Sequence, residues 1–156
     1  MNLIGTRWRH SAGYTMIAAF HRERRRVARV KVDLSAQFCI YLPSCPDVAS
    51  PSIAATVYDL SEDGISLLTN TIDSDELHIL HPTVSTLEQC FLVTEIPYGN
   101  QLLTLKGKAV WYDRNLDKHA SVYRVGVRLL DVDQNLRGKI RTLARENSCE
   151  TTNLPA

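Results

Sequence analysis

The sequence predicts a mainly β fold: a six-stranded antiparallel β-barrel closed by one C-terminal α-helix and preceded by an N-terminal extension. Three observations predict it. Apolar and polar residues alternate strictly over residues 30–42, which is the period of a half-buried strand. Later apolar runs are short and separated by turn-forming residues. Apolar residues recur at helical spacing near the end of the chain. Closure into a barrel would remove the exposed edges of such short strands.

The elements follow one another in a simple order. Residues 1–20 are expected to form the extension, with Met16 as an alternative start, and residues 148–156 a flexible tail. Between them, residues 21–147 form the barrel domain. Its predicted strands cover residues 30–42, 52–60, 64–70, 89–96, 101–113 and 122–132.

The connections are less uniform. Residues 43–51 contain three prolines and are predicted to form a loop. Residues 71–87 show no clean period and are interpreted as an insertion. Pro97, Gly99 and Asn100 form a turn between the fourth and fifth strands. A helix is predicted over residues 134–147, with Asp133 as its cap and these residues on its apolar face: Leu136, Ile140, Leu143 and Ala144.

Composition limits the partners. The chain has 156 residues, with 18 Lys and Arg against 17 Asp and Glu, so its net charge is only +1. A nucleic-acid polymer is therefore not the expected partner, because such binders usually carry a basic excess. The positive charge is instead local: residues 21–31, HRERRRVARVK, hold six of the 18 cationic residues and one acid.

The sequence gives little support for a zinc protein, a secreted protein or a membrane protein. The four cysteines match no zinc or CxxC spacing, which indicates free or buried thiols in a reducing compartment. The run AGYTMIAAF is a poor secretion signal, and no stretch approaches 18 apolar residues. We therefore expect a cytoplasmic protein without membrane insertion.

An enzyme is not expected either. P-loop, GxGxxG and GxSxG motifs are absent, and the five histidines are scattered along the chain. His78 and His81 lie three residues apart, but no neighbouring Cys or carboxylate set completes a metal site, so surface histidines are favoured. The sequence thus predicts no catalytic residues, no metal and no cofactor.

One candidate binding motif is R25-R26-V27-A28-R29, an RxxxR sequence preceded by Arg24. Arginine presents a planar fork of donors that fits phosphate oxygens, and its guanidinium plane can stack on a purine. Arg25 and Arg29 could therefore bracket a phosphodiester ring. Taken alone, the segment is better explained as a solvated basic run.

A second motif, D59-L60-S61-E62-D63-G64, lies where the second strand ends and the third begins. Asp59 could accept hydrogen bonds from the Watson–Crick edge of guanine, and Ser61 could reach a phosphate or a base atom. Gly64 allows positive φ and close approach of the backbone. Taken alone, this motif is better explained as an ordinary β-turn.

Together, RxxxR and [D/N]xSxxG about 30 residues later resemble the signature of the PilZ domain, a family of bacterial cyclic di-GMP receptors. KGKAVWYDRN followed by YRVGVRLLDVD is similar to the late strands of that family. The resemblance covers roughly residues 22–147.

The resemblance implies a function for these residues. Arg25 and Arg29 would grip phosphates and stack on guanine, while Asp59, Ser61 and Gly64 would contact a guanine base. A basic residue at the position of Arg24 is associated in the family with an intercalated ligand dimer. Because like charges in the arginine segment repel one another, the anionic ligand would order this segment on the barrel. A protein partner would then detect the change.

Two alternatives stay open. A PilZ-like adaptor could act through protein contacts without any ligand. A small RNA- or DNA-binding barrel could use the same arginines with Trp111 and Tyr112 as stacking platforms. The alternation of its strand, however, places Trp111 in the barrel core.

Overall fold

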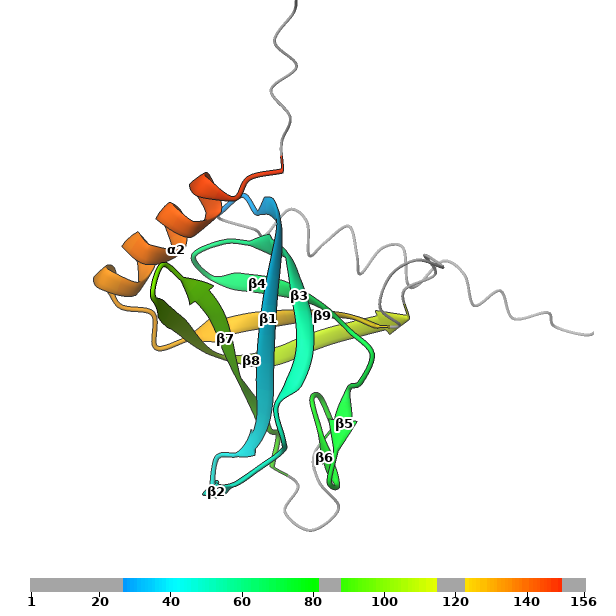
Figure 1. The fold of residues 1–156 in the computed structure, drawn as a ribbon. Coiled ribbons are helices and arrows are strands. Elements are labelled where there is room, and N and C mark those ends of the chain that lie inside the picture. Colours follow the sequence, from blue (N-terminus) through cyan, green and yellow to red (C-terminus); the bar gives the residue numbers. More distant parts are fainter. Residues whose placement is uncertain (1–26, 82–87, 115–122, 150–156) are drawn as a thin grey trace, which may run out of the picture.

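Six antiparallel strands close into a barrel in the computed structural model, which describes residues 27–81, 88–114 and 123–149 (Figure 1). The barrel strands are β1 (Val30–Leu42), β3 (Ile53–Leu60), β4 (Gly64–Thr69), β7 (Phe91–Tyr98), β8 (Gln101–Arg114) and β9 (Tyr123–Leu130). Their spatial order is β1-β3-β4-β9-β8-β7, and β7 pairs back with β1. All six predicted strands and the closed barrel are therefore confirmed.

Strand β1 shows why the alternation of apolar and polar residues predicted a strand. Its apolar residues face the interior, with Val32, Phe38 and Ile40 at most 4% exposed, while the polar residues Lys31 and Asp33 point outward. Inward-facing residues of the other strands complete one core. The period of two along the sequence is thus the period of the barrel wall.

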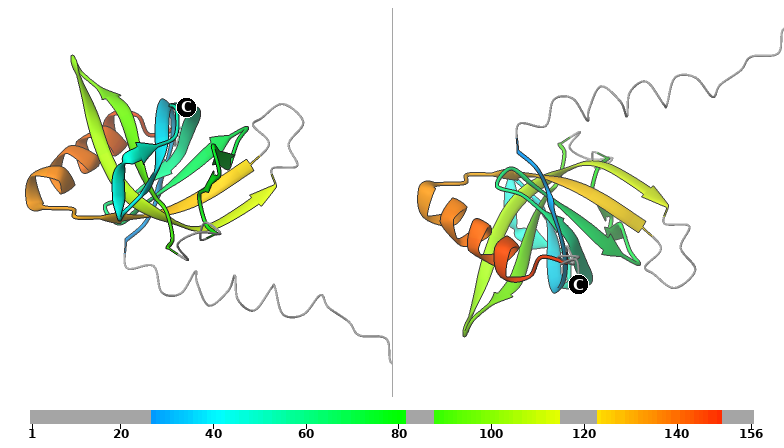
Figure 2. Two further views of the ribbon diagram at one scale, coloured as in Figure 1. Left: turned by 90° about the horizontal axis from the view of Figure 1, so that it is seen from below. Right: turned by 90° about the horizontal axis from the view of Figure 1, so that it is seen from above.

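Helix α2 (Gln134–Glu146) lies against one side of the barrel, next to β1 (Figure 2). Asp133 caps it, as predicted, by accepting a 2.7 Å hydrogen bond from the Leu136 amide. Ile140, Leu143 and Ala144 are buried against the barrel. The predicted helix, cap and apolar face are confirmed, and no helix among the described residues could span a membrane.

The prediction of a loop over residues 43–51 was wrong in part. Strand β2 (Cys45–Ala49) pairs with the end of β1, where the register shifts between Tyr41 and Leu42. All five residues of β2 are exposed at the border of the sheet. A proline is tolerated at such an edge because its missing N–H is not needed by an inner neighbour.

The poorly patterned segment that begins at residue 71 contains a very small hairpin. Strands β5 (Asp73–Ser74) and β6 (Leu77–His78) are joined by Asp75 and Glu76, both with positive φ. Two-residue strands are too short to produce a period, which explains why the sequence showed none. Residues 82–87, the extension 1–20 and most of the tail lie outside the described residues.

Candidate functional site

Arg29 is the centre of a polar cluster on the outer face of the barrel. It lies directly before β1, and its Nη1 donates to Asp59 Oδ1 at 3.2 Å and to Ser66 Oγ at 2.8 Å. Both charged side chains are largely covered, with 16% of Arg29 and 15% of Asp59 exposed. A charge-assisted hydrogen bond in such a place is worth about 1.5–3 kcal/mol. The protein itself therefore holds this guanidinium in a fixed position.

Strand pairing brings the partners of Arg29 together. Asp59 lies opposite Ser66 across β3 and β4, and Ser66 lies opposite Gly126 across β4 and β9. The β3–β4 register shifts between Val57 and Asp59. Such an irregularity re-aims the side chains that follow it, which contributes to placing the Asp59 carboxylate beside a residue from outside the barrel wall.

Gly64 makes room for Arg29. A Cβ atom at this position would lie 2.9 Å from Arg29 Nη2 and 3.1 Å from the Val127 carbonyl oxygen. The absence of a Cβ atom at Gly64 allows this close approach. The sequence also allowed a positive φ at Gly64. Among the described glycines, however, positive φ is found at Gly99.

Ser61 has a different position from the other motif residues. It is 4% exposed, its Oγ donates to Asp63 Oδ1 at 2.7 Å, and it accepts from the Gly64 amide at 3.1 Å. A backbone hydrogen bond from Ser61 N to Gly64 O closes the same turn. The structure thus brings Arg29, Asp59 and Gly64 together but directs the Ser61 hydroxyl into the turn. Arg24 and Arg25 lie outside the described residues.

Trp111 extends the cluster along the outer face, where the sequence expected a core residue. The β8–β9 register shifts between Ala109 and Trp111, and Val110 is 49% exposed. This bulge moves Trp111 out of the inward phase. Its indole covers Gly126, so closely that a Cβ atom there would overlap the ring. The row Asp59, Ser66, Gly126, Trp111 therefore runs across four strands.

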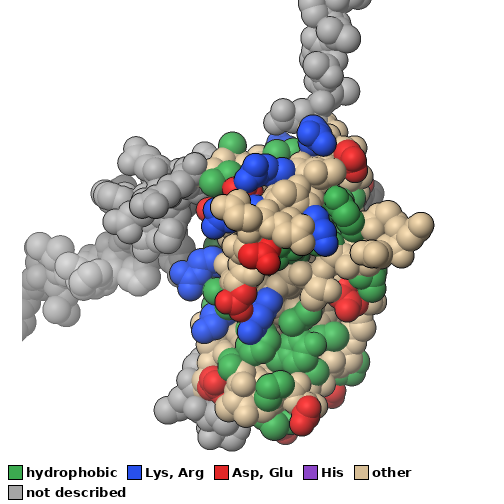
Figure 3. Space-filling model, turned by 90° about the vertical axis from the view of Figure 1, so that its left-hand side faces the viewer, with side chains coloured by type: hydrophobic (Ala, Val, Ile, Leu, Met, Phe, Trp, Pro, Cys, Tyr) green, Lys and Arg blue, Asp and Glu red, His purple; other side chains and the backbone are tan. Residues whose placement is uncertain are grey.

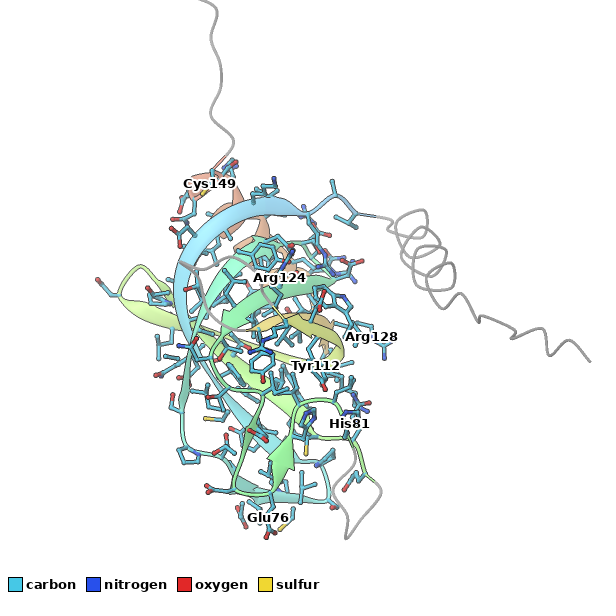
Figure 4. All side chains as sticks on the ribbon, turned by 90° about the vertical axis from the view of Figure 1, so that its right-hand side faces the viewer. Glu76, His81, Tyr112, Arg124, Arg128 and Cys149 are labelled. Atoms are coloured by element: carbon cyan, nitrogen blue, oxygen red, sulfur yellow. The ribbon has the colours of Figure 1, made fainter. Side chains whose placement is uncertain are left out.

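Two arginines of β9 flank this row (Figure 4). Arg124 donates to the Tyr58 hydroxyl, with 3.1 Å from Nε, and its guanidinium lies 4.7 Å from the centre of the Tyr58 ring. Arg128 is exposed and lies opposite Gly64. In YRVGVR the inward residues are valines, so the period of two could have predicted an outward Arg-Gly-Arg row. Ser66 could have been found in the same way.

His78 and His81 form a separate cluster lower on the barrel. The rings of His78 and His81 lie 4.5 Å apart, and the Tyr112 ring meets both of them edge-on. Within residues 27–81, 88–114 and 123–149 no group of three or more His, Cys, Asp or Glu could hold a metal ion. The four cysteines are free thiols.

Comparisons with known proteins agree on one fold. The model of the PilZ domain matches residues 22–146. Among solved structures, the PilZ domain of YcgR from Escherichia coli, determined with c-di-GMP, has a TM-score of 0.55 and 17% identity, covering 80% of this chain and 91% of that one. MrkH from K. pneumonia in a P2(1) crystal has a TM-score of 0.52 and 12% identity, covering 80% of this chain. The alignment covers 50% of MrkH. No curated protein sequence matches.

Proposed function

Because the chain belongs to the PilZ domain family, we propose that it is a receptor for cyclic di-GMP. The observation that carries the proposal is the Arg29 guanidinium, held by Asp59 and Ser66 in a space that Gly64 leaves open. This arrangement offers a cationic fork and a carboxylate within one small area, which suits a molecule that carries both phosphates and guanines. The c-di-GMP in the YcgR PilZ domain structure is consistent with that ligand.

The chemistry of binding would be an exchange of partners. A phosphodiester oxygen would compete with Asp59 for Arg29, since a guanidinium binds phosphate and carboxylate through the same planar fork. The carboxylate, thus released, could accept from guanine N1–H and N2–H₂. Ion-pair energy given up between Arg29 and Asp59 would be offset by two new charge-assisted contacts to the ligand.

The other residues predicted from the sequence would complete the site. Arg24 and Arg25 would supply further cations to the phosphates, and Arg24 would favour an intercalated ligand dimer. Ser61, whose hydroxyl hydrogen bonds within its own turn, would act by fixing that turn beside Gly64. Ordering of the arginine segment by the ligand would be the signal that a cytoplasmic protein partner detects, without catalysis.

Titration calorimetry tests the site directly. Arg25→Ala and Asp59→Ala should each weaken cyclic di-GMP binding by about 2–4 kcal/mol, the scale for removing one member of a charged pair. Arg137→Ala, an exposed arginine on α2, is the matched control and should bind like the parent. Affinity should also fall with added salt, and the stoichiometry reports monomer or dimer. Parent-like binding by both site variants would show that the site is wrongly assigned.

A thermal melt separates the receptor from the ligand-independent adaptor. A ligand that binds the native state must stabilise it, so the midpoint should rise with cyclic di-GMP concentration. An unchanged midpoint at concentrations up to the millimolar range would favour the adaptor.

A further inference from the structure

A cavity of about 190 Å³ lies between helix α2 and the segment that carries Arg29. Apolar side chains form most of its lining: Val27, Ala28, Val30, Leu60, Ile140 and Ala144. Polar and charged residues complete it, with Ser61 and Glu62 from the β3–β4 turn and Arg141 and Arg145 from α2. We call this cavity the α2 pocket. Its apolar floor and charged rim fit a large apolar side chain presented by a polar segment.

The helix beside the α2 pocket is strongly basic. It carries four cations, Arg137, Lys139, Arg141 and Arg145, against one acid, Glu146. The three arginines are four residues apart and exposed, so they form a row along one side of the helix. Figure 3, which faces the α2 side of the molecule, shows several Lys and Arg side chains on this surface. An occupant with negative charge is favoured at such a surface.

The segment preceding the pocket is a poor occupant for it. Residues 21–26, HRERRR, carry four arginines and one acid, so they would meet the arginines of α2 with the same sign of charge. Like-charge contacts across an interface are costly. The charge pattern therefore favours an acidic segment of another protein.

The α2 pocket shares its walls with the Arg29 site. Arg29 reaches Asp59 and Ser66, whereas its neighbours Ala28 and Val30 line the pocket. The β3–β4 turn is divided in the same way: Gly64 lies under Arg29, and Glu62 pairs with Arg141 of α2. A displacement of Arg29 by a ligand would thus move one wall of the pocket.

We propose that the α2 pocket binds an acidic segment of a partner protein, with one large apolar side chain in the cavity and carboxylates on Arg145 and its neighbours. Partner binding is coupled to the ligand through residues 28–30. This coupling rests on the proposed function, whereas the docking site rests on the pocket and its charge alone.

Selection from a phage-displayed library of random linear peptides identifies what the pocket binds. Peptides are selected on the parent chain and depleted on Ala144→Phe, whose added ring fills the cavity. Enrichment of Asp and Glu around a Leu, Phe or Trp is expected. Absence of enrichment, or enrichment of basic or wholly polar peptides, would overturn the docking site.

A matched pair of charge reversals tests the location without relying on a buried substitution. Arg145→Glu changes the pocket rim, while Arg137→Glu makes the same change on the same helix outside the lining. The selected peptide should lose about tenfold or more in affinity with Arg145→Glu and much less with Arg137→Glu. Equal losses would indicate diffuse charge attraction and overturn a specific pocket.

Coupling is tested by titrating the selected peptide with and without saturating cyclic di-GMP. A severalfold change in affinity is expected, and the peptide must change cyclic di-GMP affinity by the same factor. An unchanged affinity would overturn the coupling. Calorimetry with cyclic di-GMP alone on the parent and on Arg145→Glu keeps the two proposals apart, because ligand binding by both shows that a peptide failure concerns the pocket and not the receptor.

Truncation after Cys149 tests whether the C-terminal tail of the chain itself occupies the α2 pocket. Residues 150–156, ETTNLPA, contain an acid and a leucine. If their removal raises peptide affinity about tenfold, the chain's own tail occupies the pocket and the partner proposal is wrong. Unchanged affinity supports the partner.

Discussion

Two clusters of hydrogen-bonding side chains on the same barrel have opposite character. Around Arg29, a cation and a carboxylate meet beside Gly64, whose missing side chain leaves space for the guanidinium. Around His78, aromatic rings pack on one another: Nδ1 of His78 accepts 3.0 Å hydrogen bonds from the Leu80 and His81 amides, and Tyr112 meets the ring edge-on.

The difference separates the proposed binding site from a cluster with a structural role. The His78 imidazole uses its acceptor on the backbone of its own turn, and its ring contacts Tyr112 of the barrel strand β8. Partial burial, together with the neighbouring His81, lowers the pKa of His78. Arg29 instead holds an ion pair that an anion can replace. A histidine pair is often the first feature sought in a sequence, yet here the charged group beside glycine is the better candidate.

The largest expected difference between the Arg29 and His78 clusters is in their effect on cyclic di-GMP affinity. Arg29→Ala should weaken cyclic di-GMP binding by about 2–4 kcal/mol, because it removes the fork that meets the phosphate and leaves Asp59 without its cation. His78→Asn, which keeps an acceptor near Nδ1, should leave affinity unchanged. Calorimetry on both variants measures the contrast. Equal losses would mean that the two clusters do not differ in function.

Stability tests the packing beneath the site. Gly126→Ala should lower the free energy of unfolding by about 1–3 kcal/mol, because the new methyl group would overlap the Trp111 indole. Gly138→Ala is the matched control: nothing lies within 4 Å of its added Cβ, so it should stabilise the helix by about 0.5–1 kcal/mol. Denaturant unfolding gives both values. A neutral Gly126→Ala would show that Trp111 moves freely.

The pH dependence of stability should reveal the smallest effect. Because the pKa of His78 is lowered in the folded protein, the unfolded chain binds the proton more tightly. Stability should therefore fall as pH drops below about 6.5 and level off below the folded pKa. His78→Asn removes this contribution, so its thermal midpoint should change less than that of the parent between about pH 8 and about pH 5. Parallel curves would contradict a neutral, structural His78.

The barrel was predictable because its strands follow simple patterns, whereas the site depends on register. Alternation along β1 and the helical spacing of α2 were sufficient to define the fold. Trp111 was misplaced because the bulge at Val110 shifts the phase of β8, and no composition signal marks that residue. The pairing of Asp59 with Ser66 likewise depends on a register shift near Tyr58. A β-bulge changes which side chains face the site, and the pattern of apolar and polar residues does not show where the bulge lies.

The contact between Cys149 and Lys31 has a practical consequence for building a sensor. The Cys149 amide donates to the Lys31 carbonyl at 2.9 Å, so the chain leaves α2 beside the start of β1 (Figure 1). Fluorescent proteins fused before residue 22, which keeps Arg24 and Arg25, and after residue 149 would therefore be linked to neighbouring points of the barrel, next to the Arg29 site. Energy transfer between them should respond to small rotations of the arginine segment, which turns the barrel into a compact reporter of its ligand.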